Sequence, residues 1–363
     1  MKPRLLIVEL HHLGDAVIGL PFARGAAARY EVHVLCRPAT AAIYRLLEAP
    51  PTIHPWEPPW ADEARCPARI ALGAARTQGN VLRALDFEAA VSVWADARVG
   101  VLIAGTRARQ RIGFPMTAGN YYAAQLPWRG QRLALGRLLE AVWRVLHPRL
   151  PMFTHALHRA AAEQPHIGCW EQIADSLGSS CDYSAPWVKA SAPPEDIAEF
   201  ARVARGRGQQ VLAVHAHARL PTKQWPVALW KQLLDSPEVA SRFAILEIVP
   251  PGAESLGIAA GRVARTPDPE ALASVAGEAD AMLCHDSLPA HLAAALGKPV
   301  VAIFGSGEPD WFAPWNNRTR VVQQRVCPLH PCIDRCGMDH YLCLDRITTG
   351  DVIRQLELLP PHA

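Results

Sequence analysis

One short segment of the chain combines the residue types that hold an anion. Asp286 and Ser287 follow an apolar run that ends at Cys284, and a helical pattern begins near Leu288. The backbone amides of a first helical turn at a strand's carboxyl end are exposed, and the helix dipole there favours a negative charge. A diphosphate would fit this place. Asp286 and Ser287 could instead only cap the helix, and their spacing leaves both readings open.

A second segment gathers sulfur ligands. It contains Cys327, Cys332, Cys336 and Cys343, with His330 and His340 between them. Four thiolates suit a structural tetrahedral site for zinc or iron, although the spacing is not that of paired Cys-x2-Cys knuckles. Free thiols in a loop or disulfides are the alternatives. A catalytic metal is not expected here, because four thiolates leave no open coordination position.

The elements around these segments alternate between strand and helix. The N-terminal half predicts strands over 4–9, 31–36, 89–94, 99–104 and 111–114, and helices over 16–28 and 131–146. The C-terminal half predicts strands over 210–215, 242–249, 281–284 and 299–304, and helices over 194–205, 227–234, 269–276, 288–296 and 351–358. This alternation is typical of doubly wound parallel α/β sheets. Pro21 predicts a kink in the first helix or a helix that begins there.

The length of 363 residues favours two domains, which we place at 1–188 and 189–363. Segments 50–67 and 118–130 read as long loops, either for acceptor recognition or as packed insertions. The net charge of +3, without basic runs interleaved with aromatics, argues against a nucleic-acid partner. The arginines of 107–111 could face phosphates, acidic lipid or only solvent.

No signal peptide is expected at the N-terminus, because Glu9 interrupts its apolar run. No apolar run is long enough to span a membrane, so we expect a cytoplasmic protein that could still rest against the inner membrane. Five further cysteines are scattered as buried thiols in a reducing compartment would be.

Longer stretches of the chain resemble a known family. Segment 286–305 reads Asp-Ser-x-x-x-His-Leu-Ala-Ala-Ala-Leu-Gly-x-Pro-Val-Val-Ala-x-Phe-Gly and is followed by Trp311-Phe-Ala-Pro-Trp315. It resembles the donor-binding signature of glycosyltransferase family 9, the lipopolysaccharide heptosyltransferases. Leu13-Gly-Asp with Pro21, and Lys223-Gln-Trp-Pro226, resemble two further family segments in order and spacing. The resemblance implies a GT-B fold, with two Rossmann-like domains facing a central cleft, and a metal-independent inverting transfer from ADP-heptose.

The same resemblance assigns roles to single residues. It implies that Asp15, in the acceptor-binding N-terminal domain, deprotonates the attacking hydroxyl, although an Asp there could also be an ordinary helix N-cap. Lys223 would offset the charge of the departing diphosphate in place of a divalent cation.

Three more residues belong to the expected donor site, and one has a weaker claim. Asp286 would bind sugar hydroxyls, Ser287 would help to cradle phosphate, and His291 would point back toward the same place unless it only packs. Glu254 stands where the family often has an acidic residue for the nucleotide ribose.

The acceptor is left open among a lipopolysaccharide-core intermediate, a protein such as an autotransporter, and a small metabolite. One family branch that modifies autotransporters holds iron with cysteines after the donor motif. The alternatives are a non-catalytic nucleotide-sugar-binding protein and, more distantly, an epimerase, for which Gly-x-Gly-x-x-Gly and Tyr-x-x-x-Lys are missing.

Several positions depart from the family pattern. Leu288 fills a place that is usually Gly, His217-Ala218 replaces a hydroxyl-bearing pair, and His11-His12 precedes Leu-Gly-Asp. These changes put the two sugars in doubt more than the fold.

Overall fold

The computed structural model describes residues 2–61, 66–122, 126–161, 163–184, 186–259, 261–333 and 335–360. Parts of the expected loops 50–67 and 118–130 lie outside these ranges. The chain forms two compact units, Met1–Tyr183 and Ser184–Ala363. The boundary therefore follows Tyr183, where the sequence had suggested residue 188.

Unit 1 is built on a six-stranded parallel sheet with the strand order β3-β2-β1-β4-β5-β6. The strands are β1 (Arg4–Glu9), β2 (Glu31–Cys36), β3 (Thr52–Pro55), β4 (Ala89–Ser92), β5 (Gln110–Gly113) and β6 (His155–Ala156). The helices are α1 (Leu13–Ala26), α2 (Ala41–Arg45), α3 (Ala68–Leu82), α4 (Ala97–Thr106), α5 (Pro127–Leu146) and α6 (His166–Ser176), and the 3-10 turns are η1 (Pro38–Thr40) and η2 (Arg83–Leu85).

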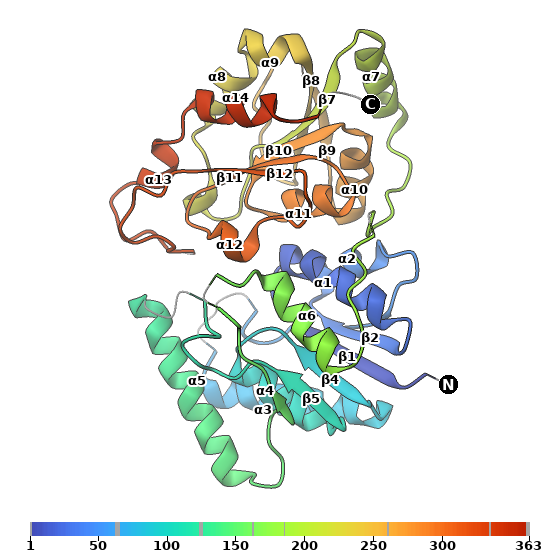
Figure 1. The fold of residues 1–363 in the computed structure, drawn as a ribbon, viewed down its shortest axis with the longest axis vertical. Helices are drawn as coiled ribbons and strands as arrows, with labels where there is room; N and C mark the ends of the chain where they lie inside the picture. Colours follow the sequence, from blue (N-terminus) through green and yellow to red (C-terminus); the bar gives the residue numbers. More distant parts are fainter. Residues whose placement is uncertain are drawn as a thin grey trace. The chain divides into compact units, whose positions relative to one another are not determined.

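Unit 2 repeats this plan with the order β12-β11-β10-β7-β8-β9 (Figure 1). Its strands are β7 (Gln210–His215), β8 (Phe243–Val249), β9 (Arg262–Arg265), β10 (Ala281–His285), β11 (Val300–Phe304) and β12 (Thr319–Gln323). The helices are α7 (Glu195–Gly206), α8 (Val227–Leu234), α9 (Pro237–Arg242), α10 (Pro269–Glu278), α11 (Leu288–Ala295), α12 (Pro309–Phe312), α13 (Leu342–Asp345) and α14 (Thr349–Glu357), with the 3-10 turn η3 (Pro221–Lys223).

Both sheets have the Rossmann strand order, counted from the first strand of each unit. The order reverses between β1 and β4 in unit 1 and between β7 and β10 in unit 2. The central strands β1, β4, β10 and β11 are buried almost throughout, because helices cover both faces of the sheets. Ligands of such folds bind beyond the carboxyl ends of the strands at this reversal, so the two reversals locate the places to search.

The first helix differs from its prediction. It begins at Leu13 and continues through Pro21 to Ala26, so Asp15 lies in its first turn and not in a preceding loop. Proline costs a helix one hydrogen bond, but here the helix is buried from Ala16 to Ala23, and packing offsets that cost.

The predicted strand over 99–104 is wrong, because these residues belong to helix α4. Every residue of α4 except Arg98 is buried. A helix that is apolar all round has no 3.6-residue alternation, and a short apolar run of this kind cannot be told from a strand by pattern.

Candidate functional site

The reversal in unit 2 brings together three of the residues predicted to bind the donor. Asp286 directly follows β10, and Lys223 ends the turn η3 that follows β7. Lys223 Nζ lies 2.6 Å from Asp286 Oδ2, and the Asp286 side chain is only 4% exposed. Burial makes such a pair far less screened than one at the surface. His291 lies close enough for both charges to act on its pKa.

Neither Asp286 nor Ser287 caps the N-terminus of α11 with its side chain, which was the alternative to a phosphate site. Ser287 is the N-cap residue, but its hydroxyl makes no capping hydrogen bond and instead donates to the His285 carbonyl. The Asp286 carboxylate pairs with Lys223. The amide of the first helical residue, Leu288, and the positive end of the helix dipole follow two residues after Asp286, the partner of Lys223, and this arrangement suits a phosphate group.

Neutral histidines surround this place. Burial lowers the pKa of His291 to about 4. The nearby Asp286 carboxylate raises this pKa, and the Lys223 ammonium lowers it further. Burial also lowers the pKa of His285 to about 3 and that of His215 to about 4. His285 Nε2 accepts a hydrogen bond from the Trp225 amide at 2.8 Å. This bond requires the unprotonated nitrogen and holds the Lys223 loop against β10.

A glycine lets the next loop approach Asp286. A Cβ atom at Gly307 would collide with Asp286 Oδ2, so the loop after β11 comes this close only with glycine. The amide of the neighbouring Ser306 donates to the Thr222 carbonyl beside Lys223 at 3.2 Å. The loops after β7, β10 and β11 thus form one connected floor.

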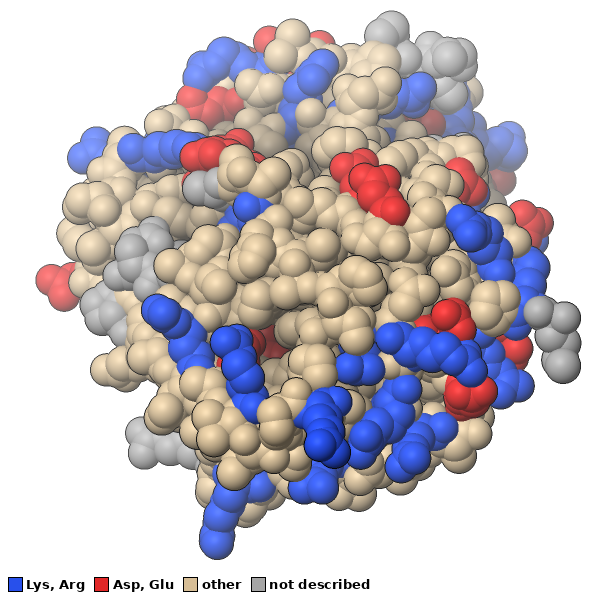
Figure 2. Space-filling view, turned by 60° about the horizontal axis from the view of Figure 1, so that its bottom comes forward, with Lys and Arg blue, Asp and Glu red and all other residues tan. Residues whose placement is uncertain are grey.

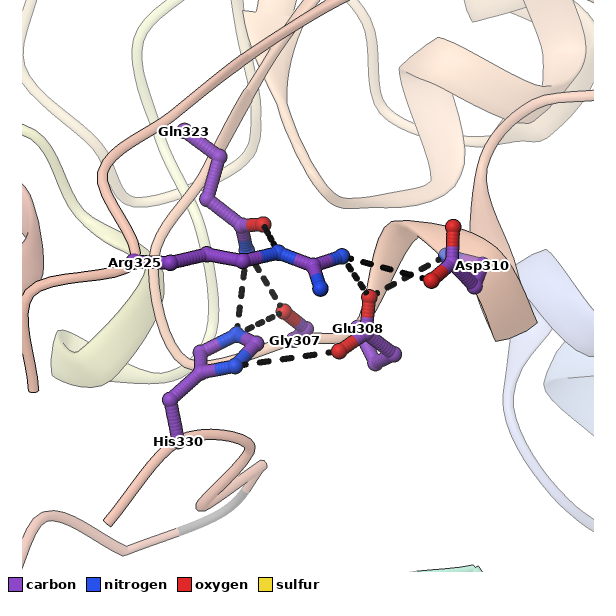
Figure 3. A network of polar contacts seen from close by, with 6 residues as sticks. All are labelled: Gly307, Glu308, Asp310, Gln323, Arg325 and His330. Atoms are coloured by element: carbon purple, nitrogen blue, oxygen red, sulfur yellow. Dashed lines mark hydrogen bonds and ion pairs between the residues drawn. The ribbon is translucent and has the colours of Figure 1, made fainter. Parts of the chain in front are cut away.

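Polar contacts from the C-terminal part of unit 2 hold that floor (Figure 3). His330 Nε2 and Gln323 Nε2 lie 3.0 and 2.9 Å from the Gly307 carbonyl. Arg325 pairs with Glu308 Oε1 at 2.5 Å, on the edge of α12. The loop after β11 is therefore held from the Gly307 backbone and from the Glu308 side chain.

The cysteine segment supports the same loop. The Ile333 amide donates to the Ser306 carbonyl at 2.9 Å, and Ser306 Oγ donates to the Ile333 carbonyl at 2.6 Å. All four cysteines of the segment are free thiols. Burial raises the pKa of Cys332 to about 12, and Cys336, Cys343 and Cys327 add to the shift, so the four sulfurs lie in one region.

The described His, Cys, Asp and Glu side chains of this region do not form a metal site. Within the described ranges, no group of three or more His, Cys, Asp or Glu side chains is arranged to hold a metal ion. A structural zinc or iron needs about four ligands, each at about 2.0–2.3 Å from the ion. The described arrangement does not fit the predicted site, whereas the contacts to Ser306 show that the segment packs against the donor loop.

Glu254 is exposed on the loop that follows β8. A residue that sequence reasoning missed holds that loop. Glu247 is 1% exposed, and its carboxylate accepts hydrogen bonds of 2.6 Å from Ser255 Oγ and the Leu256 amide. Glu247 lies within an apolar strand. A single carboxylate in such a strand is a sequence signal, because a buried carboxylate needs hydrogen-bond partners.

Asp15 lies near the corresponding reversal in unit 1. It is the third residue of α1, and its Oδ2 accepts a hydrogen bond from the His12 amide at 3.0 Å. This is the local helix-terminal role that the sequence allowed, at the third helical position and not at the N-cap. The side chain is half-buried.

A buried acid beside Asp15 is a second residue that sequence reasoning missed. Glu9 ends β1 and is fully buried, and it accepts hydrogen bonds from the His11 amide and from Trp94 Nε1 at 3.0 and 3.1 Å. Burial, and to a smaller extent the charge of Asp15, raises the pKa of Glu9 to about 8, although the two hydrogen bonds act to lower it. At neutral pH Glu9 is therefore mostly protonated and adds little negative charge beside Asp15.

Aromatic rings line the rest of this region. His11 stacks on Trp94 with ring centroids 4.0 Å apart, and Trp94 in turn lies 4.4 Å from His166. Burial lowers the pKa of His11 to about 3, so its ring is neutral. Part of the loop over 50–67 reaches α4, where the Arg98 guanidinium lies 4.9 Å from the centre of the Trp60 ring. Flat neutral rings suit the apolar face of a sugar.

Comparisons with known proteins agree with this architecture. Residues 258–341 match the model of the family "Glycosyltransferase family 9 (heptosyltransferase)". No curated protein sequence matches the chain. Among solved structures, a family 9 glycosyl transferase from Veillonella parvula is 14% identical with a TM-score of 0.68, and the match covers 98% of this chain and 97% of that one.

Two Escherichia coli structures match over the same extent. Heptosyltransferase WaaC, solved with ADP, is 18% identical with a TM-score of 0.64 and coverage of 98% and 99%. ADP-heptose lps heptosyltransferase II is 15% identical with a TM-score of 0.62 and coverage of 98% for both chains. The family 9 match spans Asp286, Ser287 and His291, and along its whole length the chain shares the GT-B fold of these solved heptosyltransferases.

Proposed function

We propose that the chain transfers a heptose from ADP-heptose to an acceptor hydroxyl, with inversion and without a metal ion. The observation that carries this proposal is the Lys223–Asp286 ion pair beside the open N-terminus of α11. WaaC was solved with ADP, and heptosyltransferase II is named for ADP-heptose. These names support the choice of donor to be tested.

In this proposal unit 2 binds the donor. The Lys223 ammonium, the Leu288 amide and the positive end of the α11 dipole receive the diphosphate and stabilise the charge that it gains as it leaves. Asp286 accepts hydrogen bonds from sugar hydroxyls, Ser287 contributes its hydroxyl to the phosphate, and neutral His291 donates or accepts without adding charge. Glu254 is assigned to the nucleotide ribose, and its exposed position leaves it accessible to a ligand.

Unit 1 supplies the acceptor side in this proposal. Asp15 takes the proton of the attacking hydroxyl while the oxygen bonds to the anomeric carbon and the bond to ADP breaks. A base for this step must be ionised at neutral pH. Burial keeps the neighbouring Glu9 mostly protonated at neutral pH, so this acid adds little negative charge beside Asp15.

The aromatic side chains near Asp15 indicate which class of acceptor this protein binds in our proposal. His11 stacks on Trp94, and both side chains are partly exposed, which suits the face of a sugar ring, so a glycan acceptor such as a lipopolysaccharide-core intermediate is our first choice. A protein hydroxyl or a small metabolite would use the same base and is an outcome of the test.

The donor is tested by thermal shift with ADP-heptose, ADP, UDP-glucose and GDP-mannose. A ligand at a hundred times its Kd adds about 2.7 kcal/mol to the folded state, so we expect ADP and ADP-heptose alone to raise Tm. Raised Tm with a UDP or GDP sugar instead would contradict the choice of nucleotide.

Turnover is then tested by donor consumption in wild type and Asp15→Asn, with acceptor glycans, peptides and EDTA in separate arms. We expect Asp15→Asn to bind ADP-heptose normally and to lose at least a hundredfold in kcat, and EDTA to leave the rate unchanged. Binding without turnover in the wild type, across all acceptors, would point to a non-catalytic nucleotide-sugar-binding protein. Normal turnover by Asp15→Asn would remove Asp15 as the base.

A further inference from the structure

Helix α5 exposes an apolar face to solvent. Of the large hydrophobic residues that are exposed in the described part of the chain, five lie on this one helix: Leu135, Leu138, Val142, Val145 and Leu146, each 45–78% exposed. Exposed apolar side chains are ordinary when single, but a contiguous group of them marks an interaction surface. Figure 1 shows α5 along the edge of unit 1, with its length open on one side.

The opposite face of α5 is the one that packs onto unit 1. Gly136 lies against Met116, and Trp143 packs on the core of the unit and donates to the Leu150 carbonyl at 2.8 Å. Glu140 accepts a hydrogen bond from the Met116 amide at 2.9 Å. The helix is therefore anchored by its inner face. The exposed apolar face is a second, separate face of the helix and is not the one that packs on the core.

The outward residues form one stripe. At about 100° per residue, the stripe from Ala141 through Val145 and Leu138 to Leu146 spans about 140° of the helix circumference. Arg137 and Arg144 lie along one edge of the stripe and Arg132 along the other, all three exposed. Arginines can turn their head groups aside while the apolar side chains between them are covered.

The charge on this surface has one sign. Segment 127–150 contains five arginines and a single acidic residue, Glu140, which lies on the inner side. Figure 2 brings the bottom of the view in Figure 1 forward, and Lys and Arg gather over the lower part of the face that it shows. None of the described helices has the length and apolar character needed to cross a membrane.

We propose that the exposed face of α5 binds an anionic phospholipid surface, with the helix lying in the plane of the headgroups. An apolar stripe bordered by arginines is the pattern of an interfacial helix. Anionic headgroups would supply the negative charges that pair with these arginines. This surface does not depend on the donor site or on turnover.

A second copy of the chain is the rival occupant. Residues 135, 138, 142 and 145 follow the 3-4-3 spacing of a coiled-coil seam. Two such helices would set arginines against arginines on the flanks, however, because α5 exposes no acidic partner for them. The stripe is also wider than a coiled-coil seam, which favours a lipid surface.

The test is co-sedimentation of the full chain with vesicles. We expect binding to vesicles of phosphatidylcholine mixed with phosphatidylglycerol, weakened by added salt, and little binding to phosphatidylcholine alone. The triple variant Leu138→Ser, Val142→Ser, Val145→Ser should lose on the order of tenfold or more in affinity. The double variant Arg137→Gln, Arg144→Gln should lose about fivefold for each arginine.

The control is the pair Val81→Ser and Val227→Ser, which removes exposed valines from α3 and α8 and should bind as the wild type does. All variants change exposed side chains, and their melting curves would confirm that they fold. Absence of binding by the wild type, or unchanged binding by the triple variant, would overturn the proposal. So would a concentration-dependent dimer in ultracentrifugation that the triple variant abolishes, because a second copy would then cover α5.

Discussion

At the residue scale, Lys223 and Asp286 are linked by charge in a place that water reaches poorly. The carboxylate is almost fully buried and the ammonium is 22% exposed. Removing one member of a buried pair leaves the other unpaired and costs more than the pair itself contributes to stability. The donor role assigned to the pair can therefore be separated from its structural role by a double-variant cycle.

We expect Lys223→Met to lower the free energy of unfolding of unit 2 by about 3 kcal/mol, because Asp286 stays buried without its partner. Lys223→Met with Asp286→Leu should regain most of this stability, because two apolar side chains replace the pair. Both variants should fail to bind ADP-heptose. Calorimetry and thermal shift check the two effects. Lys231→Met, on the exposed side of α8, is the control and should change neither quantity.

Donor binding that survives in the double variant would show that the pair is only structural. Wild-type stability in Lys223→Met would show that Asp286 does not depend on the ammonium.

At the element scale, the packing of α3 on α4 depends on a close approach of two backbones. A Cβ at Gly79 would collide with the Leu102 carbonyl oxygen and would lie 2.9 Å from the Gly105 Cα. Helices approach this closely only where small residues face each other, and backbone atoms cannot move aside as a flexible side chain can. This contact holds α4, which carries Arg98 at its start, against the sheet.

We expect Gly79→Ala to destabilise unit 1 by about 1–3 kcal/mol, because the added methyl forces the two helices apart. Gly73→Ala is a matched control on the same helix, since no atom lies within 4 Å of its added Cβ. It should stabilise unit 1 by about 0.5–1 kcal/mol through helix propensity. Urea unfolding measures both. Equal effects of the two substitutions would contradict the close packing.

At the scale of the whole molecule, the two units carry different buried titratable groups. In unit 2, His215, His285 and His291 are buried and neutral, with pKa values of about 4, 3 and 4 against an ordinary 6.5. In unit 1, the pKa of Glu9 is raised to about 8 and that of His11 is lowered to about 3. The two units should therefore respond to pH in different ways.

We expect unit 2 to lose stability as the pH falls from about 6.5 toward 4, because its unfolded state binds up to three more protons than its folded state. The slope is at most about 4 kcal/mol per pH unit. In unit 1 the folded state binds more protons through Glu9, so its stability falls as the pH rises from about 4.5 to 8, and His11 opposes this below 6.5.

Hydrogen exchange followed by mass spectrometry reports on the peptides of each unit separately. On acidification, peptides of unit 2 should lose protection first. The variant Glu9→Gln should flatten the response of unit 1 above pH 6.5 while leaving unit 2 unchanged. Loss of protection in both units at the same pH would contradict the assignment.

The chain's sequence by itself was enough to locate most elements and the donor segment. Strands β1, β2 and β7 and helix α8 have the bounds that the pattern predicts, because apolar runs flanked by turn residues are local signals. The order Asp-Ser before a helix also predicted where Asp286 and Ser287 stand in unit 2. Their catalytic and binding roles, like those of Asp15 and Glu254, stay predictions.

Tertiary structure alone decided the rest. Segment 99–104 is a helix and not a strand, and its burial against α3, α5, β4 and β5 removes the periodicity that would have indicated this. Glu9 became a protonated acid because the fold removed it from water beside Asp15. The pairing of Lys223 with Asp286 depends on the strand order that sets β7 next to β10. Burial, pairing and exposure are relations between distant residues, so they arise only when the chain is folded.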